Sequence, residues 1–247
     1  MTDHSKTALI LGATSDIGRA LARAFARRGN SLILAAREPD DLTSDAADLR
    51  LRFGVTVAVA AFDLLDIESF APLLASMPEP PNIVVMVAGL LGEQARSEAD
   101  TGAAERVVRT NYLGPILLLG EIGNQMERRG NGIIIGISSV AGDRGRASNY
   151  IYGSAKAGFS AFLSGLRNRL ASAGVRVITV KPGFVRTRMT EEMTLPAWLT
   201  AEPEEVAEAI LGAIAHGRDV VYVRRIWRLV MALISLVPER LFKRLRL

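Results

Sequence analysis

Short apolar runs rich in β-branched residues alternate with longer segments of helical periodicity along this chain. Each run is apolar almost throughout, which is typical of strands buried on both faces of a parallel sheet. Because parallel strands are joined by crossover helices, the alternation predicts a doubly wound α/β fold whose ligands bind at the carboxyl ends of the strands. We expect seven strands in one parallel sheet with helices on both faces, at residues 7–11, 31–35, 55–60, 83–87, 132–137, 175–180 and 219–223.

Helix start and stop signals fill the intervals between these runs. The longest predicted helix, 99–129, contains Gly114-Pro115, where we expect an irregularity because proline lacks the N–H that a helix needs. With 247 residues and no repeat or low-complexity linker, we expect one domain over residues 1–223 and an extension over 224–247. The other expected helices are 17–28, 40–52, 67–77, 149–173 and one that starts at Pro203 and ends before Gly217.

The composition excludes several kinds of chemistry. With no Cys and only two His, the chain has no thiol nucleophile and too little material for a zinc site or a Ser-His-Asp triad, so we expect no metal. The lack of Cys also fits a reducing compartment. The first residues lead directly into a strand and do not have the charged-then-apolar pattern of a signal peptide. These features predict a cytoplasmic protein.

A glycine-rich turn, GATSDIG, occupies residues 12–18 between the first strand and the first helix. Glycine permits a sharp turn, and the helix N-terminus offers N–H groups and a positive dipole to a pyrophosphate, with nearby hydroxyls as further donors. An ordinary glycine-containing turn is the alternative. Asp16 brings a carboxylate close to the expected phosphate, so its side chain must turn away or cap the helix. The predicted dinucleotide contacts here are Gly12, Thr14, Ser15, Ile17 and Gly18.

Arg37 directly follows the second expected strand. At this place a dinucleotide-binding fold carries either an acid for the ribose hydroxyls or a cation for a 2′-phosphate. This chain has no acid there, and the guanidinium is a fork-shaped donor that suits phosphate. The sequence therefore favours NADP(H) as cofactor. NAD(H) is the alternative cofactor, and a solvated surface arginine is the non-functional interpretation.

Tyr152 and Lys156 lie four residues apart in an expected helix, downstream of Ser138-Ser139 at the end of an apolar run. Residues with this spacing share one face of a helix, so the phenol and the ammonium project side by side. A buried cation beside a phenol favours the phenolate and lowers a pKa that is about 10 when unperturbed. The pair therefore predicts a tyrosine that exchanges a proton near neutral pH.

With these motifs, the chain resembles the short-chain dehydrogenase/reductase family over residues 7–223. The resemblance rests on the glycine-rich turn, Asn111, Ser139, the Tyr152/Lys156 pair and the sequence KPGFVRT at 181–187, in this order. It implies a Rossmann fold and an NAD(P)H-dependent enzyme that reduces a ketone to a secondary alcohol.

The resemblance also implies catalytic roles. Tyr152 gives the carbonyl oxygen a proton while hydride moves from the nicotinamide. Lys156 holds the nicotinamide ribose and lowers the tyrosine pKa, Ser139 hydrogen-bonds the reacting oxygen, and Asn111 anchors a water in the proton relay. Pre-placed O–H donors stabilise the charge that hydride delivery builds on oxygen, so the chemistry of the residues agrees with these roles.

Further cofactor contacts follow from the resemblance. Asp63, after the third strand, matches the family's adenine contact, and a helix cap is an equal interpretation. Residues 86–89, MVAG, stand where the family has Asn-Asn-Ala-Gly, which implies some local rearrangement. The segment that closes over the nicotinamide is matched by residues 182–187. The resulting predicted contacts are Asp63, Ala88, Gly89, Pro182, Val185 and Thr187, together with Tyr152 and Lys156.

Residues 189–199 take the place of the family's mobile substrate lid. They are apolar at Met189, Met193, Leu195, Trp198 and Leu199, which suits a greasy substrate. Packing of the same side chains into the core is an equal alternative.

The extension is basic and apolar. Residues 224–247 hold seven cations and one anion, and removing these from 30 basic and 26 acidic residues leaves 23 against 25. The positive charge is therefore local, which argues against nucleic-acid binding and points to an anionic partner for the tail. The apolar stretch 226–237 is too short to span a bilayer core of about 30 Å. It predicts either a peripheral anchor at the inner face of a membrane, with Trp227 and the cations near headgroups, or an extension packed on the body or on a second subunit.

The tail and the glycine-rich turn make the chain similar to one subgroup of the family, the reductases of decaprenylphosphoryl-2-keto-pentose. This similarity implies a lipid-linked keto-sugar as substrate. A soluble reductase of a small ketone or β-ketoacyl substrate is the alternative, followed by a dinucleotide-sensing module without catalysis. By analogy with the family we expect a homodimer or homotetramer formed through the long helices.

Overall fold

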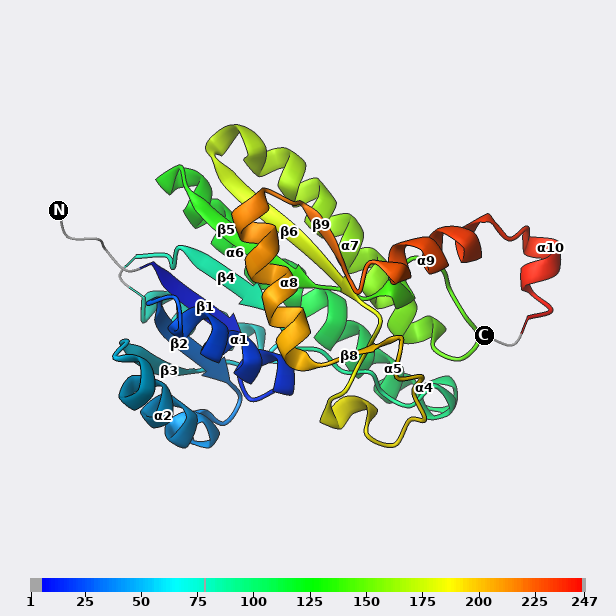
Figure 1. Ribbon diagram of the computed structural model, residues 1–247, viewed down its shortest axis with the longest axis horizontal. Coiled ribbons are helices and arrows are strands. Elements are labelled where there is room, and N and C mark those ends of the chain that lie inside the picture. Colours follow the sequence, from blue (N-terminus) through cyan, green and yellow to red (C-terminus); the bar gives the residue numbers. More distant parts are fainter. Residues whose placement is uncertain (1–5, 78, 246–247) are drawn as a thin grey trace.

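The computed structural model describes residues 6–77 and 79–245, and its centre is a seven-stranded parallel sheet (Figure 1). The strands lie in the order β3-β2-β1-β4-β5-β6-β9, and every pairing between them is parallel. The predicted doubly wound sheet is therefore confirmed. The strands are β1 (Thr7–Leu11), β2 (Ser31–Ala36), β3 (Val57–Ala61), β4 (Ile83–Met86), β5 (Gly132–Ile137), β6 (Val175–Pro182) and β9 (Val220–Val223).

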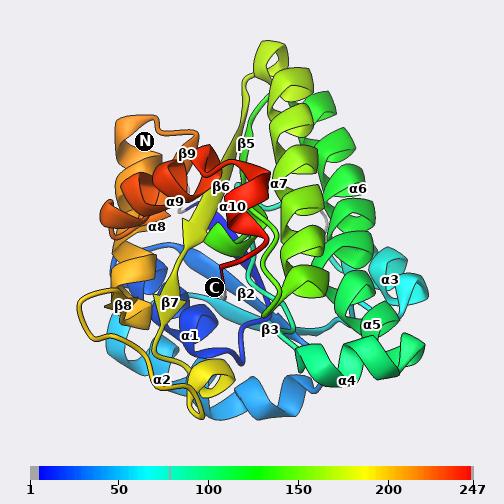
Figure 2. The same cartoon turned by 90° about the vertical axis from the view of Figure 1, so that its right-hand side faces the viewer.

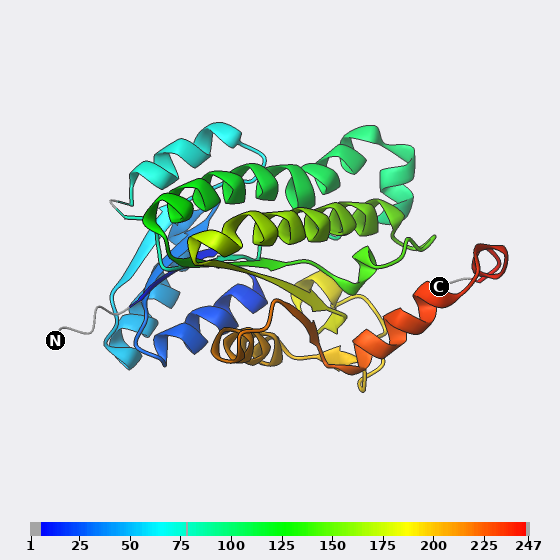
Figure 3. The same ribbon diagram turned by 90° about the horizontal axis from the view of Figure 1, so that it is seen from above.

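Helices cover both faces of the sheet, as seen from above in Figure 3. One layer contains α1 (Asp16–Ala26), α2 (Thr43–Phe53) and α8 (Pro203–His216). The other contains α3 (Phe70–Ala75), α6 (Gly114–Arg129) and α7 (Tyr150–Leu170).

The strand residues divide between the two layers by simple alternation. In β1, Ala8 and Ile10 pack into the α1–α8 layer, whereas Leu9 and Leu11 pack into the α6–α7 layer. All four are fully buried. Since a strand points successive side chains to opposite faces, a sheet covered on both sides needs apolar residues at every position. This requirement explains the nearly continuous apolar runs in the sequence.

The long helix expected over 99–129 is broken. It consists of α5 (Thr101–Val108), a π-helical turn at Arg109–Leu113, and α6, and α4 (Gln94–Ala99) precedes it. Pro115 lacks the N–H that would bond the carbonyl of Asn111 four residues earlier, so the helical ladder opens around Asn111 instead of at Gly114-Pro115. Gly114 is needed for packing, because a Cβ atom there would lie 2.5 Å from the Leu64 carbonyl oxygen.

Other differences from the expected elements lie at their ends. The third strand begins two residues later than predicted, and short 3₁₀ turns at Pro39–Leu42 and Ile67–Ser69 precede α2 and α3. The sequence did not indicate β7 (Phe184–Val185) and β8 (Thr200–Ala201), which pair in parallel and enclose the expected lid segment. Two-residue strands have no periodicity from which to predict them.

The extension begins with α9 (Ile226–Leu236), and one face of this helix packs on the body. Trp227 and Met231 are buried with Val140. The Trp227 ring meets Phe184 edge-on at 5.3 Å between centroids, and its Nε1 donates to the Leu199 carbonyl at 3.1 Å. The expectation that Trp227 sits near lipid headgroups is therefore wrong, because its apolar surface and its N–H both have partners inside the protein.

Arg144 fixes the far end of α9. Its guanidinium donates to the carbonyls of Ser235 and Val237, each at 2.9 Å, and pairs with Glu239 at 2.8 Å. It also lies 4.0 Å from the centre of the Phe242 ring, which belongs to α10 (Glu239–Phe242). Cations stabilise helix C-termini, so Arg144 ties the tail to the loop that follows β5.

The other face of α9 is apolar and exposed. We call Ile226, Leu229, Leu233 and Leu236 the leucine stripe, since they follow helical spacing and are 40–78% exposed. Figures 1 and 3 show α9 and α10 extending from the end of the molecule opposite the start of β1. Within residues 6–77 and 79–245, no helix is long and apolar enough to cross a membrane. Arg246, which belongs to the predicted basic tail, lies outside the described residues.

Candidate active site

The predicted cofactor residues follow successive strands of the sheet. Gly12 follows β1, Arg37 follows β2, and Ala88 lies shortly after β4. Asp63 and Ser139 similarly follow β3 and β5. Because these strands are parallel, all of these residues lie along the carboxyl edge of the sheet, where doubly wound folds bind ligands.

The glycine-rich turn packs closely against the residues after β4. Gly12 has φ 96°, and a Cβ atom there would lie 2.7 Å from the Ala88 nitrogen. A Cβ atom at Gly18 would lie 2.5 Å from the Gly12 carbonyl oxygen. Both glycines therefore let the start of α1 approach the sheet edge, and the first turn of that helix keeps N–H groups for an anion.

Ser15 acts within the turn. Its hydroxyl accepts from the Gly18 N–H at 3.0 Å, which makes it the N-cap of α1, and donates to the Gly12 carbonyl at 2.8 Å. The hydroxyl hydrogen that we expected Ser15 to offer to a phosphate is therefore used inside the chain. N-cap serines are bound to the helix in this way because the first N–H groups lack helical partners.

The Asp16 side chain points away from the glycine-rich turn, as expected for a carboxylate that would otherwise repel a bound phosphate. Its carboxylate accepts from the Arg188 backbone N–H at 2.8 Å and lies 3.5 Å from the Arg188 guanidinium. That guanidinium also donates to the Thr14 carbonyl at 2.5 Å. The contact joins the glycine-rich turn to the segment after β7, which contains Thr187. Thr187 N-caps the 3₁₀ turn Arg188–Thr190.

Lys156 is the buried centre of the predicted catalytic group. It is 3% exposed, its Nζ donates to the Ile137 carbonyl at 3.0 Å, and it lies 5.7 Å from the centre of the Tyr152 ring. A Cβ atom at Gly89 would lie 3.4 Å from the Lys156 Nζ and 3.0 Å from the Asn111 Oδ1. The structure thus brings Gly89, Asn111, Tyr152 and Lys156 together.

Asn111 is fully buried in the π-helical turn, and its amide bonds to backbone. It donates to the carbonyls of Val107 at 2.8 Å and Leu90 at 2.6 Å, and it accepts from the Leu90 N–H at 3.2 Å. Asn111 therefore braces the chain after β4. The opening of the helix at the π turn is a common feature of functional sites.

The pKa values of the tyrosine and the lysine differ from expectation. Burial raises the pKa of Tyr152 to about 12, and a side-chain hydrogen bond with Ser139 opposes this rise. Burial also lowers the pKa of Lys156 to about 8. The expected fall of the tyrosine pKa below 10 is therefore wrong, because removal of the phenolate from water outweighs its favourable contacts.

Ser138, the neighbour of Ser139, supports this group. Its hydroxyl donates to the Lys156 carbonyl at 2.9 Å and lies 2.7 Å from the Ser160 hydroxyl, so it fixes α7 against the end of β5. Sequence reasoning noted Ser138 only as part of a serine pair. A polar residue at the end of a buried strand was the available signal that Ser138 positions the neighbouring helix.

The predicted adenosine contacts lie further along the sheet edge. Arg37 is exposed and makes no ion pair with the described residues. Asp63 accepts from the Leu65 N–H at 3.0 Å with one oxygen, so it does cap a turn. The contact of Asp63 with adenine stays a prediction, for which its other carboxylate oxygen is the available acceptor. Pro182 and Val185 are buried, and Val185 packs into the α1–α8 layer. Gly183 lies between them and has no room for a side chain against the Trp227 ring of the tail.

A cavity of about 260 Å³ opens beside Tyr152. Its apolar wall includes Leu91, Phe184 and Met193, and its polar wall includes Arg146 and Asn149. Met189, Met193 and Trp198 of the expected lid are exposed, so core packing does not account for them. Arg146 and Asn149 were not predicted. The signal for them was their place in the loop between the fifth strand and the tyrosine helix, at the ligand-binding edge.

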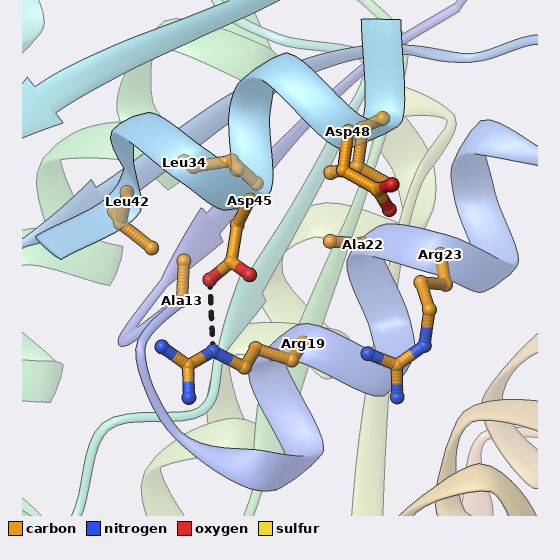
Figure 4. Close-up of a pocket in the computed structure, with 9 residues that line it drawn as sticks. Ala13, Arg19, Ala22, Arg23, Leu34, Leu42, Asp45 and Asp48 are labelled. Atoms are coloured by element: carbon orange, nitrogen blue, oxygen red, sulfur yellow. Dashed lines mark hydrogen bonds and ion pairs between the residues drawn. The ribbon is translucent and has the colours of Figure 1, made fainter. Parts of the chain in front are cut away.

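A second cavity lies between α1 and α2 (Figure 4). It measures about 30 Å³, enough for a water molecule or two, and the Arg19–Asp45 pair at 2.8 Å closes its side. None of the predicted site residues lines this cavity. It is a packing feature of the α1–α2 interface.

Comparison with known proteins agrees with this geometry. The model of the short chain dehydrogenase family matches residues 6–197. An uncharacterized oxidoreductase of Mycobacterium tuberculosis is 40% identical over 240 residues, which cover 96% of each chain. A short-chain dehydrogenase from Sphingobium yanoikuyae in complex with NADPH superposes with TM-score 0.81 and 27% identity, covering 95% of this chain and 97% of that one. A short chain dehydrogenase from Burkholderia cenocepacia in complex with NADP gives TM-score 0.83 at 25% identity, covering 99% and 98%. This chain belongs to the short-chain dehydrogenase family.

Proposed function

We propose that this oxidoreductase uses NADPH to reduce a ketone to a secondary alcohol in the cavity beside Tyr152. The observation that carries the proposal is that the Tyr152 phenol, which lines this cavity, meets the Ser139 hydroxyl and the buried Lys156 ammonium. Bound NADPH would supply the hydride. The residues of the chain supply the proton and the groups that orient the carbonyl.

These groups can supply a proton and stabilise the charge that develops during reduction. A phenol with a pKa of about 12 keeps its proton at neutral pH, so Tyr152 is ready to donate it to the carbonyl oxygen. The Ser139 hydroxyl stabilises negative charge at the same place, since its hydrogen bond lowers the tyrosine pKa. The charge of the Lys156 ammonium stabilises the tyrosinate left after the transfer.

The cofactor preference rests on Arg37. The glycine-rich turn and Gly89 have no room for side chains, which fits close approach of a dinucleotide along the strand ends. Arg37 is exposed at the end of β2, where a 2′-phosphate would lie in such a fold, and the two structural relatives described above hold NADPH or NADP. NADH is the alternative cofactor.

The finer proposal for the substrate is a lipid-linked keto-sugar presented at a membrane surface. The leucine stripe supports it, because an apolar face next to the exposed cations Arg225 and Arg228 is the pattern of an interfacial helix. The cavity supports it too, because its lining combines apolar and polar walls. A small free ketone or β-ketoacyl substrate is the alternative, and it needs no membrane contact.

The oligomeric state of the protein, a homodimer or a homotetramer, stays a prediction.

Replacement of the proton donor tests the reaction. We expect Tyr152→Phe to lower kcat/KM for ketone reduction about 10²–10⁴-fold, the usual worth of a positioned acid. NADPH binding, followed by nicotinamide fluorescence, should weaken by no more than about tenfold, the worth of one hydrogen bond. The control is Tyr150→Phe, an exposed phenol on the same helix, which should leave activity unchanged. Full activity of Tyr152→Phe would falsify the proposed reaction.

The pH dependence of kcat/KM tests the role of Lys156. Its ammonium is present below a pKa of about 8 and is lost above it, whereas Tyr152 stays protonated across this range. We therefore expect kcat/KM for reduction to be level below about pH 7.5 and to fall about tenfold per unit well above pH 8. Lys156→Arg keeps its charge at higher pH and should move the fall upward. A level profile to pH 9.5 in the unmodified enzyme would contradict this role.

Binding of the two cofactors tests Arg37. If Arg37 contacts the 2′-phosphate, Arg37→Ala should weaken NADPH binding by about 1–3 kcal/mol, which is roughly 5–150-fold, and leave NADH binding within about twofold. Arg28→Ala, which removes an exposed cation at the end of α1, is the matched control. Equal weakening of both cofactors would remove the basis for an NADPH preference.

Flotation with lipid vesicles tests the membrane proposal. The triple change Leu229→Ser, Leu233→Ser and Leu236→Ser removes three of the four residues of the leucine stripe and leaves the buried Trp227 face intact. We expect the unmodified protein to float with vesicles containing phosphatidylglycerol and the triple variant to stay behind. Leu51→Ser, at an exposed position on α2, should float normally. If the unmodified protein and the triple variant behave alike, the stripe is not a membrane anchor.

A further inference from the structure

Two buried polar atoms at the wall of the substrate cavity have no hydrogen-bond partner in the described part of the chain. They are the Nε of Arg146 and the Oδ1 of Asn149. Both residues line the cavity that contains Tyr152, and the Asn149 N–H donates to the Arg146 carbonyl at 3.1 Å. Buried polar groups in native proteins are nearly always paired, so two unpaired atoms in one cavity indicate groups that a ligand completes.

The cation of Arg146 also has no counter-charge in the described part of the chain. Among residues 6–77 and 79–245 no carboxylate forms an ion pair with it, and burial lowers its pKa. A partly buried guanidinium without an anion is costly, and an oxyanion that binds it offsets the cost. Its planar fork matches a carboxylate or a phosphate with two parallel hydrogen bonds.

The loop that carries Arg146 is held so that this side chain remains available. Asp143, at the start of the loop, pairs with Lys181 at 2.5 Å and accepts from the Tyr222 hydroxyl at 2.9 Å. Arg144 is occupied by the end of α9. The nearest acid in sequence and the neighbouring arginine therefore both have other partners, and Arg146 faces the cavity.

We propose that Arg146, with Asn149 next to it, binds an oxyanion of the ketone substrate, either a carboxylate or a phosphate ester. Asn149 Oδ1 accepts a hydrogen bond from a hydroxyl beside that group. The apolar wall at Leu91, Phe184 and Met193 takes the remaining carbon skeleton. This assignment rests on the proposed ketone reduction, and it makes Arg146 a specificity-determining residue for a negatively charged ketone.

Two matched pairs of ketones test the assignment. Levulinate and methyl levulinate differ by a carboxylate, and dihydroxyacetone phosphate and dihydroxyacetone differ by a phosphate. In NADPH-dependent reduction we expect the unmodified enzyme to prefer the charged member of one pair by at least about tenfold in kcat/KM, the worth of a charged hydrogen bond. The pair that shows the preference identifies the oxyanion.

Substitution of Arg146 should remove that preference. In Arg146→Gln we expect the KM of the charged ketone to rise about tenfold or more, with kcat/KM of its neutral partner within about twofold. Arg146→Lys, which keeps the charge without the fork, should lie between. Arg96→Gln, which removes an exposed cation from α4, should change nothing. Unchanged NADPH binding shows that each variant is folded. Absence of a charge preference, or its survival in Arg146→Gln, overturns the assignment.

A binding measurement separates this assignment from the proposed reaction. The four compounds are titrated calorimetrically into the enzyme saturated with NADP⁺. If no ketone is reduced but the charged compound binds and Arg146→Gln weakens it about tenfold, the reaction is wrong and the oxyanion site stands. If ketones are reduced but charged and neutral members bind equally to both proteins, the reaction stands and the oxyanion site is wrong.

Discussion

The burial of the Lys156 ammonium determines how the active site is built. A buried cation needs hydrogen-bond acceptors, and Lys156 finds one in the Ile137 carbonyl at the end of β5. This contact requires α7 to lie close to the strand. Gly136 permits the approach, because a Cβ atom there would lie 2.9 Å from the Phe159 ring, and Ser138 bonds the Lys156 carbonyl. The tyrosine one helical turn earlier is then held at the cavity wall.

The sheet could be predicted from the sequence because burial on both faces leaves a direct trace, a run of apolar residues with no polar alternation. The break in the long helix left only a partial trace. Gly114-Pro115 indicates an irregularity, but its exact place at Arg109–Leu113 also involves the contact between Asn111 and Leu90, a residue 21 positions away. Likewise, β7 and β8 exist only because the segments before and after the lid pair with each other. Such tertiary contacts override local propensity.

Among the site residues, those with a helical spacing or a place at a strand end were predicted, and the structure brings Asn111, Ser139, Tyr152 and Lys156 to one place. What the sequence could not convey was the degree of burial. Burial reverses the expected direction of the Tyr152 pKa and removes Trp227 from any lipid surface. For Arg146 the only signal was its place in the loop after the fifth strand, because a lone arginine in a loop looks the same whether solvent or a cavity surrounds it.

The sequence becomes basic and apolar from residue 224 on, but the tail packs on the body as the preceding elements do. Trp227 touches Phe184 of the cavity wall and bonds Leu199 at the end of the lid segment, and Met231 packs on Val140 next to Ser139. In the end-on view of Figure 2, α9 and α10 lie in front of the sheet edge that bears the site. Arg144 also joins the end of α9 to the loop that carries Arg146 of the cavity wall. The tail is therefore part of the packing that holds the substrate cavity, and its basic composition does not mark a structural boundary.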